Sequence, residues 1–221
     1  MSIIQQLIGW DKELFLLLNG LHNSFFDGFM YTYTKVLVWI PLYVALAFVL
    51  VKNARKESVW LILALALCVL VADQIASGFF KETVERLRPS RNPDFEGIVH
   101  LVKNRKGGNF GFVSSHAANT FGVALLASLF IRNKIFTISL FAWSLVNCYS
   151  RIYLGLHYPA DIAGGIIVGT FSALLIYFLI KKFRPQSLPS YVSGKDSLWP
   201  VYTLLASVGI IVLYVAFFFY Q

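Results

Sequence analysis

Six apolar stretches, each about 20 residues long, recur along this sequence and are separated by short polar segments. A helix of about 20 apolar residues is long enough to cross the hydrocarbon core of a bilayer. The stretches lie near residues 31–51, 58–80, 113–131, 135–154, 160–180 and 198–219. With 57% hydrophobic and only 14% charged residues, the chain is far more apolar than a soluble domain of its size. We therefore expect an all-α, polytopic membrane helix bundle with about six transmembrane helices, forming a single membrane domain.

The segment before the first stretch has a mixed composition that suits a membrane surface better than a membrane crossing. Residues 3–21 combine large apolar side chains with six polar ones: Gln5, Gln6, Asp11, Lys12, Glu13 and Asn19. This pattern predicts an interfacial helix within a segment, residues 1–27, that leads to the first span. Residues 2–10 lack the basic start and the cleavage site of a signal peptide, so we expect the mature chain to keep its N-terminus.

The net charge of +8 comes from basic residues in the loops between the apolar stretches. In a soluble protein this charge would suggest nucleic acid, but beside membrane spans it favours membrane lipids as partners, and no nucleic acid. Cys68 and Cys148 fall inside predicted spans without metal-pair or disulfide spacing, so both are expected to be inert core thiols. Gly164, Gly165 and Gly169 in the fifth span predict close packing against a neighbouring helix.

The basic residues also predict the orientation of the bundle. One side holds short loops whose cations adjoin the span ends and have no catalytic use: Lys52, Arg55, Lys56, Arg132, Lys134, Lys181, Lys182, Arg184 and Lys195. The other side holds the long connection 81–112, whose prolines, glycines and charges exclude it from the hydrocarbon core. Raw counts of cations are similar on the two sides, but cations in short loops determine orientation. We therefore expect a bacterial inner membrane protein with the short loops in the cytoplasm and the long connection in the periplasm.

Three polar clusters that are far apart in the sequence fall on the same predicted side, outside the cytoplasm. They are Lys81-x6-Arg88-Pro89 after the second span, Ser114-Ser115-His116 at the start of the third, and Ser150-Arg151-x5-His157-x3-Asp161 between the fourth and fifth. Ser114 occupies the position of a helix N-cap, where free backbone N–H groups bind anions. Pro159 suits the first turn of a helix, which lets His157 and Asp161 come into contact.

Together the clusters contain the groups that phosphoryl transfer requires. Cations must hold the non-bridging oxygens, a nucleophile must stand in line with the leaving oxygen, and an acid must protonate that oxygen. Lys81 and Arg88 form a pair that can hold one phosphate. A histidine whose second ring nitrogen is oriented by a carboxylate is an activated nucleophile, and His157 with Asp161 fits this description. His116 remains as the acid.

In residues and order, the clusters resemble the signature of the type 2 phosphatidic acid phosphatase superfamily, which also includes the soluble vanadium-dependent haloperoxidases. That signature reads Lys-x6-Arg-Pro, Pro-Ser-Gly-His and Ser-Arg-x5-His-x3-Asp, and its first and third parts are present here unchanged. The resemblance covers about residues 58–180, the expected phosphatase core, and leaves 198–219 as an additional C-terminal helix. In the second part Val113 replaces the proline and Ser115 the glycine. Serine resists dihedral angles that glycine permits, so we expect the phosphate loop to differ from the family pattern here.

The resemblance implies a role for each site residue. The phosphate would be held by the side chains of Lys81, Arg88, Arg151 and Ser114 and by the backbone N–H of Ser115. His157 would form a phosphohistidine with the support of Asp161. His116 would protonate the leaving group and then activate the water that releases phosphate. The resemblance implies no metal ion or other cofactor, and it implies inhibition by vanadate as a phosphate mimic.

The expected activity is metal-independent hydrolysis of a phosphomonoester or pyrophosphate on a membrane lipid. The family suggests four substrates: undecaprenyl pyrophosphate, phosphatidylglycerol phosphate, phosphatidic acid and the phosphates of lipid A. A lipid phosphotransferase, in which an alcohol captures the phosphohistidine, is an alternative with the same site. A non-catalytic lipid-binding or transport bundle would require the histidines to be dispensable. A haloperoxidase would share the anion site, but the membrane spans oppose it.

Two further polar features favour structural interpretations. Asp73 lies inside the second span, where we expect it to pair within the bundle. The run Lys103, Arg105 and Lys106 in the long connection could recognise a second phosphate, but a solvated loop is the preferred interpretation.

Overall fold

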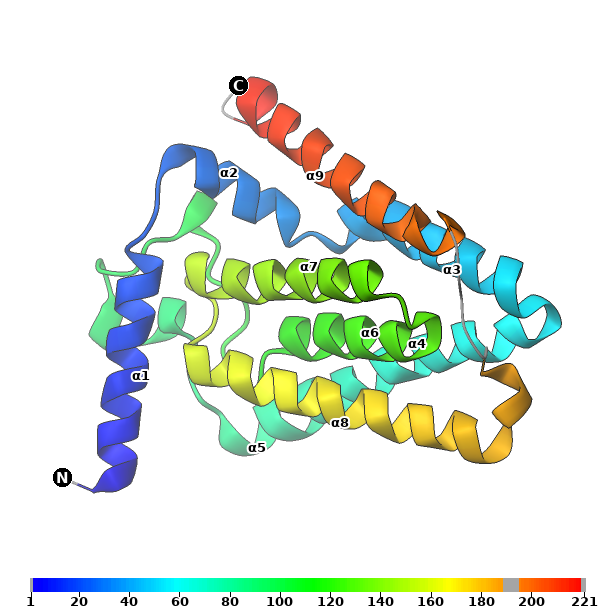
Figure 1. The fold of residues 1–221 in the computed structure, drawn as a ribbon. Coiled ribbons are helices and arrows are strands. Elements are labelled where there is room, and N and C mark those ends of the chain that lie inside the picture. The colour runs from blue at the N-terminus through cyan, green and yellow to red at the C-terminus, as the bar shows by residue number, and fades with distance from the viewer. Residues whose placement is uncertain (1, 189–194, 220–221) are drawn as a thin grey trace.

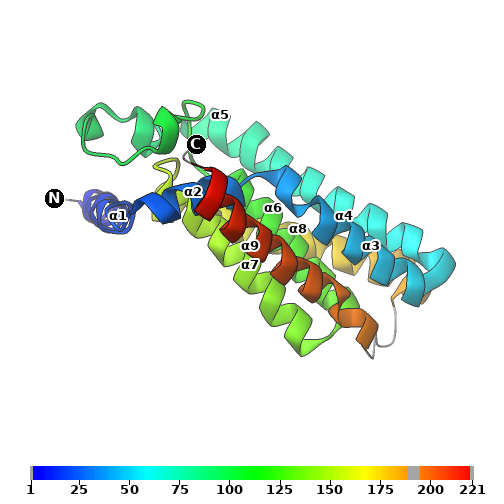
Figure 2. The same ribbon diagram turned by 90° about the horizontal axis from the view of Figure 1, so that it is seen from above.

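The computed structural model describes residues 2–188 and 195–219, and all regular secondary structure in these ranges is helical. Six helices run side by side as a bundle: α3 (Ile40–Ala54), α4 (Ser58–Asp73), α6 (Ser115–Ile131), α7 (Lys134–Tyr153), α8 (Pro159–Phe183) and α9 (Trp199–Phe218) (Figures 1 and 2). Helix α6 packs against α4, α7 and α8, and α9 packs against α3. Cys68 and Cys148 are buried free thiols, as expected. The all-α prediction is confirmed.

In the part of the chain that the structure describes, four segments are long and apolar enough to cross a membrane: Val36–Val84, Lys134–Tyr153, Pro159–Phe183 and Asp196–Phe218. The first of them contains both α3 and α4, which a short turn at Arg55–Glu57 joins. The segment Ser115–Ile131 is a further, shorter apolar helix. The six expected spans therefore correspond to the six bundle helices, and the chain is an integral membrane protein.

The first span differs from its prediction at 31–51. Residues Ser24–Tyr33 form a separate helix, α2, whose N-cap Asn23 accepts a hydrogen bond from the backbone of Phe26. A 3-10 turn at Val36–Trp39 follows, and α3 begins only at Ile40 with Pro41 in its first turn. The charged Lys35 and a proline that suits a helix start divide the apolar run into two helices.

The second span extends beyond α4 toward one end of the bundle. After Asp73 the chain continues as a π-helical segment, Gln74–Phe80, and then as the short helix α5, Lys81–Val84. Segments of π-helix are frequent at functional sites. Asn119 Nδ2 on α6 donates to Asp73 Oδ1 at 3.5 Å, so the pairing expected for Asp73 within the bundle is present.

Helix α1 (Ile3–Asn19) runs across one end of the bundle, crosswise to α7 and α8 (Figure 1). A capping box between Ser2 and Gln5 closes its N-terminus. Phe15, on its inner side, is buried against Phe95 and Tyr158. Its outer side exposes large apolar side chains, namely Ile3, Leu7, Trp10, Leu14 and Leu17. This arrangement suits a helix at a membrane surface, which stays a prediction.

Helices α6 and α8 approach each other closely through glycine. A Cβ atom at Gly165 would collide with the backbone oxygen of Ser114, and one at Gly169 would collide with that of Ala118. These two glycines therefore allow the helix contact that the sequence predicted. The contact sets the first turn of α6 directly beside the first turn of α8, where two of the three polar clusters lie.

Candidate active site

The three polar clusters meet at the end of the bundle that α1 crosses. The first cluster follows α4, the second opens α6, and the third connects α7 to α8. Arg88 of the first cluster bonds to His157 of the third, and the backbone of Ser114 in the second bonds to that of Asp161. The structure therefore brings the predicted site residues together around one position.

His157 lies in the short connection between α7 and α8 and is only 2% exposed. Its Nε2 atom is 2.8 Å from Nη1 of Arg88, which also donates to the carbonyl of Leu156 at 3.0 Å. A guanidinium can only donate, so Nε2 carries the lone pair and Nδ1 carries the proton. Burial lowers the pKa of His157 well below its ordinary value, and the charges of Arg88, Arg151 and Lys81 lower it further. The ring is thus neutral, and the lone pair on Nε2 accepts a hydrogen bond from Arg88.

Asp161 lies in the first turn of α8 and is fully buried. Its Oδ2 atom accepts the backbone N–H of Tyr158 at 3.0 Å and is 3.4 Å from Nδ1 of His157. Its Oδ1 atom accepts a hydrogen bond from Arg86 at 2.9 Å. The His157 contact is longer than a charge-assisted hydrogen bond, but such catalytic contacts commonly tighten when substrate binds. The carboxylate therefore faces the side of the imidazole opposite Nε2.

Three cations surround His157, and none of them is paired with a carboxylate in the described part of the chain. No acidic side chain forms a salt bridge with Lys81, Arg88 or Arg151 within residues 2–188 and 195–219. Lys81 donates to Ser115 at 2.6 Å and to Ser77 at 3.0 Å, and Arg151 donates to Thr34 at 2.9 Å. Burying unpaired charge is costly, so this arrangement is that of an anion site.

The start of α6 adds backbone donors to the site. Ser114 is the N-cap, and its hydroxyl accepts the backbone N–H of Ala117 at 3.4 Å. The helix N-terminus therefore lies at the end of the bundle that holds the cations, where it favours an anion. Ser115, which replaces the glycine of the family signature, uses its hydroxyl to hold Lys81. This substitution thus adds a side-chain contact that glycine cannot make.

His116 is half-buried one residue further along α6. It lies within electrostatic range of Arg151, His157 and Lys81, and its backbone carbonyl accepts the hydroxyl of Thr120 at 2.8 Å. The two histidines therefore belong to one cationic site, with His116 on α6 and His157 in the connection between α7 and α8.

Residues 57–185 match the PAP2 superfamily. The chain belongs to this superfamily. It is 38% identical to the lipid A 4'-phosphatase of Bacteroides thetaiotaomicron, over 96% of this chain and 98% of that protein. It is 37% identical to the lipid A 4'-phosphatase of Porphyromonas gingivalis, over 88% of this chain and 86% of that protein. The crystal structure of a transmembrane PAP2 type phosphatidylglycerolphosphate phosphatase from Bacillus subtilis has the same fold, with a TM-score of 0.61 and 21% identity over 83% of this chain and 89% of that one.

This PAP2 protein is accordingly a phosphatase that acts on lipids, as its named relatives are. The expected family, fold and enzyme class are confirmed. Within the described residues, no group of three or more histidine, cysteine or acidic side chains is arranged to hold a metal ion.

Two charged residues at the site of this PAP2 protein were assigned no role there by the sequence analysis. Arg86 was counted only as a cation of the long connection, yet it contacts Asp161. Asp11 was counted only as a polar residue of the interfacial helix, yet its Oδ2 accepts from Arg86 at 2.6 Å. These two residues are far apart in the sequence, and neither lies in a motif position.

The long connection carries three exposed cations, one of which lies close enough to the site to affect it electrostatically. Lys103, Arg105 and Lys106 are all exposed, which agrees with a solvated loop. Arg105 nevertheless lies within electrostatic range of Arg88 and His116, so it adds to the positive field of the site. The interpretation of this run as a solvated loop was therefore incomplete for Arg105.

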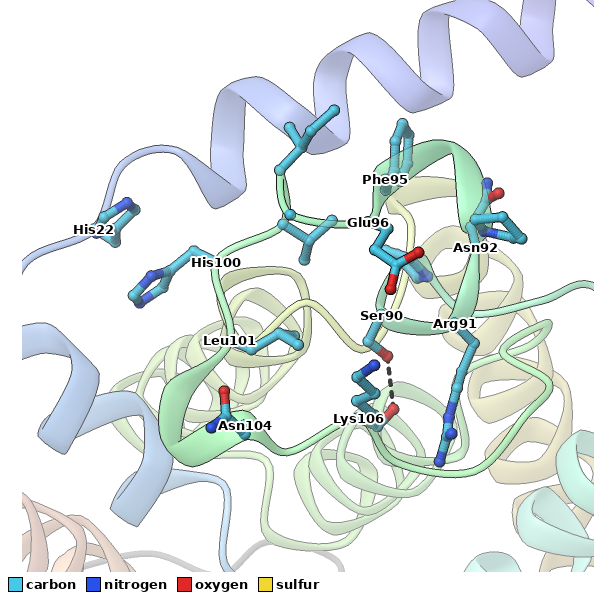
Figure 3. A pocket seen from close by; sticks show the side chains of 15 residues that line it. His22, Ser90, Arg91, Asn92, Phe95, Glu96, His100, Leu101, Asn104 and Lys106 are labelled. Atoms are coloured by element: carbon cyan, nitrogen blue, oxygen red, sulfur yellow. Dashed lines mark hydrogen bonds between the residues drawn. The ribbon is translucent and has the colours of Figure 1, made fainter.

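The same connection encloses a polar pocket of about 770 Å³ beyond Arg88 (Figure 3). Figure 3 shows Ser90 joined to the backbone of Lys106 on one side, with His22 and His100 on the other. The two histidine rings stack with their centroids 3.7 Å apart. No predicted catalytic or phosphate-binding residue lines this pocket. It is therefore distinct from the position where the three clusters meet.

The lowered pKa of His157 predicts the acidic side of the pH profile. Protonated imidazole cannot attack phosphorus, so activity falls as pH drops through the pKa of this residue in the free enzyme. Because that pKa lies well below 6.5, we expect the acidic limb of kcat/KM for an aryl phosphate to lie below pH 6.5, after correction for ionisation of the substrate. An acidic limb centred at or above pH 6.5 would contradict this account.

Proposed function

We propose that this protein removes a phosphate, of the lipid A 4'-phosphate type, from a saccharide lipid through a phosphohistidine at His157. The observation that carries the proposal is a set of three cations around a neutral histidine, namely the buried Arg88 and Arg151 and the half-buried Lys81, none of which forms a salt bridge with a carboxylate in the described residues. The match to two lipid A 4'-phosphatases supports the substrate class, because the match to the first covers 96% of the chain. It therefore extends beyond the core at 57–185 to include most of the outer helices.

The first half of the reaction transfers the phosphoryl group to the protein. The lone pair on His157 Nε2 attacks phosphorus, and the bond between phosphorus and the lipid oxygen breaks. The leaving oxygen takes a proton from His116 as the bond breaks. Asp161 faces the Nδ1–H group and stabilises the positive charge that the imidazole gains.

Arg88 has to change partner in this step. In the structure its Nη1 atom bonds to the attacking Nε2 of His157. A phosphate oxygen is a stronger acceptor, so we infer that Arg88 turns its donors to the substrate and frees the lone pair. Lys81, Arg151 and the N-terminus of α6 take the other non-bridging oxygens.

The second half of the reaction releases phosphate. His116, now neutral, removes a proton from a water molecule, which attacks phosphorus as the bond to Nε2 breaks. Inorganic phosphate leaves and both histidines return to their starting states. Vanadate, which adopts the geometry of the five-coordinate phosphorus, should bind among the same cations and inhibit.

The first prediction of this scheme concerns the nucleophile. His157→Ala should lower phosphate release by on the order of 10⁴-fold or more, because the acceptor of the phosphoryl group is lost. The assay uses purified protein in detergent with lipid A, phosphatidylglycerol phosphate and undecaprenyl pyrophosphate as separate substrates. His22→Ala is the matched control, since His22 is exposed and lies at the separate pocket.

We expect wild-type protein to cleave lipid A fastest, and the His22 variant to behave like wild type. Near-normal release by His157→Ala would exclude the mechanism, and faster cleavage of another lipid would exclude the proposed substrate. Phosphate recovered on an alcohol acceptor, and not free in solution, would identify a phosphotransferase.

The second prediction concerns the acid. A lipid alkoxide is a poor leaving group that needs a proton, whereas the phenolate of an aryl phosphate needs little help. His116→Ala should therefore reduce kcat/KM, which reports the phosphoryl-transfer step, much more for the lipid than for p-nitrophenyl phosphate. Equal losses on the two substrates would contradict the role of His116 as general acid.

We also propose that the protein resides in a bacterial inner membrane with the site facing the periplasm. Support comes from the cations at the other end of the bundle, around the α3–α4 turn, residues 132–134 and residues 181–184. Single cysteines at Arg55 and Lys103, in a chain lacking Cys68 and Cys148, can be tested with an impermeant thiol reagent on spheroplasts. Labelling at 103 alone is expected, and labelling at 55 alone would reverse the orientation.

A further inference from the structure

An ion-pair chain of Asp11, Arg86 and Asp161 links helix α1 to the proposed nucleophile. Arg86 Nη2 donates to Asp11 Oδ2 at 2.6 Å, and Arg86 Nη1 donates to Asp161 Oδ1 at 2.9 Å. The side chains of Asp11, Arg86 and Asp161 are 11%, 23% and 0% exposed. Such shielded pairs are screened by salt much less than pairs on the surface.

The guanidinium of Arg86 is held in a fixed plane. Its Cζ atom lies 4.0 Å from the centroid of the Tyr158 ring, so the group stacks while it bonds to two carboxylates. Asp11 is fixed in turn, because its Oδ1 atom accepts the backbone N–H of Ala160 in the first turn of α8 at 2.8 Å. Both ends of the ion-pair chain are therefore attached to the first turn of α8, at Ala160 and Asp161.

This arrangement sets the rotation of the Asp161 carboxylate. With Oδ1 bonded to Arg86, the other oxygen is left to face the backbone of Tyr158 and Nδ1 of His157. Without Arg86, the carboxylate could rotate and lose its alignment with the imidazole. The group that orients the nucleophile is thus itself oriented by a residue outside the three clusters.

We propose that Arg86 and Asp11 are positioning residues, which act through Asp161 to align the imidazole of His157 for phosphoryl transfer. The inference rests on the proposed roles of His157 and Asp161. It gives α1 a part in catalysis, because the helix expected at the membrane surface supplies one end of the ion-pair chain. The half-buried Asp11 lies on the same helix as the exposed apolar side chains of Leu7 and Leu14.

Because Arg86 and Asp11 carry opposite charges, their substitutions should have opposite effects on the protonation of His157. A general structural role would not produce opposite effects. Loss of the Arg86 cation favours protonated His157, whereas loss of the Asp11 anion disfavours it. The acidic limb of kcat/KM should therefore move to higher pH in Arg86→Gln and to lower pH in Asp11→Asn. The charged and titratable groups that face His157 itself are the same in both variants, namely Arg88, Arg151, Lys81, His116 and Asp161.

The experiment uses the full chain in detergent with p-nitrophenyl phosphate, a soluble probe that does not depend on access from the membrane. We expect Arg86→Gln to lose kcat by on the order of 10²-fold with little change in KM, and Asp11→Asn to lose less. Arg86→Lys keeps the positive charge but lacks the planar guanidinium that can bond to two carboxylates. The acidic limb of its kcat/KM profile should therefore match wild type, while its kcat should lie between those of Arg86→Gln and wild type.

Asp94→Asn is the matched control. It removes another ion pair between α1 and the long connection, Lys12–Asp94 at 2.9 Å, which does not touch Asp161. We expect this variant to keep the wild-type kcat and pH profile. Thermal unfolding in detergent identifies variants that fail to fold, and if Arg86→Gln is one of them, Arg86→Lys and Asp11→Asn carry the test.

Two results would overturn the inference. One is a kcat in Asp11→Asn and the Arg86 variants equal to that of Asp94→Asn, and the other is a pH limb that moves in the same direction in Asp11→Asn and Arg86→Gln. His157→Ala distinguishes this failure from failure of the proposed function. An inactive His157 variant beside unaffected Asp11 and Arg86 variants rejects the positioning role alone, whereas an active His157 variant rejects the proposed mechanism.

Discussion

The gathering of three cations around one histidine, with Arg88 and Arg151 buried and Lys81 half-buried, is the constraint on which the site depends. Removing an unpaired charge from water costs on the order of several kcal/mol, and Arg88 and Arg151 are only 8% and 5% exposed. Hydroxyl and carbonyl groups satisfy some of their donors but do not balance their charge. A phosphate group does balance it. Burial lowers the pKa of His157, and the same positive field lowers it further, so the cations proposed to bind the substrate also help to keep the proposed nucleophile unprotonated.

Asp161 links the cationic site to the packing of helices α6 and α8. Its carboxylate contacts His157 and Arg86, and its backbone carbonyl accepts the N–H of Ser114, the N-cap of α6, at 2.9 Å. That backbone contact is possible because Gly165 lets α6 and α8 approach. The residue that orients the imidazole therefore also joins the two helices whose N-termini form the site. Packing inside the bundle and geometry at the phosphate position are set by the same contacts.

Much of this arrangement could be predicted from the sequence, because apolar length defines spans and alternate spans return the chain to the same side. Spacing of four residues likewise predicted that His157 and Asp161 meet. The break at Lys35 was missed because hydropathy averages over a single charge. Thr34, which bonds Arg151, and the Asp11–Arg86 pair were missed because such contacts join residues far apart in sequence. Only the folded chain brings them together.

Direct trapping of the phosphorylated protein tests the central claim, that His157 accepts the phosphoryl group. Wild-type protein and His116→Ala would be mixed with radiolabelled p-nitrophenyl phosphate, whose leaving group needs little help from an acid. The reaction would be quenched in base within milliseconds, and the labelled peptide would be identified. The account predicts an acid-labile, base-stable label on the peptide containing His157, with more label in His116→Ala because its hydrolysis by water is slowed. Full phosphate release in wild type with no labelled protein in either form, or a label on another residue, would contradict it.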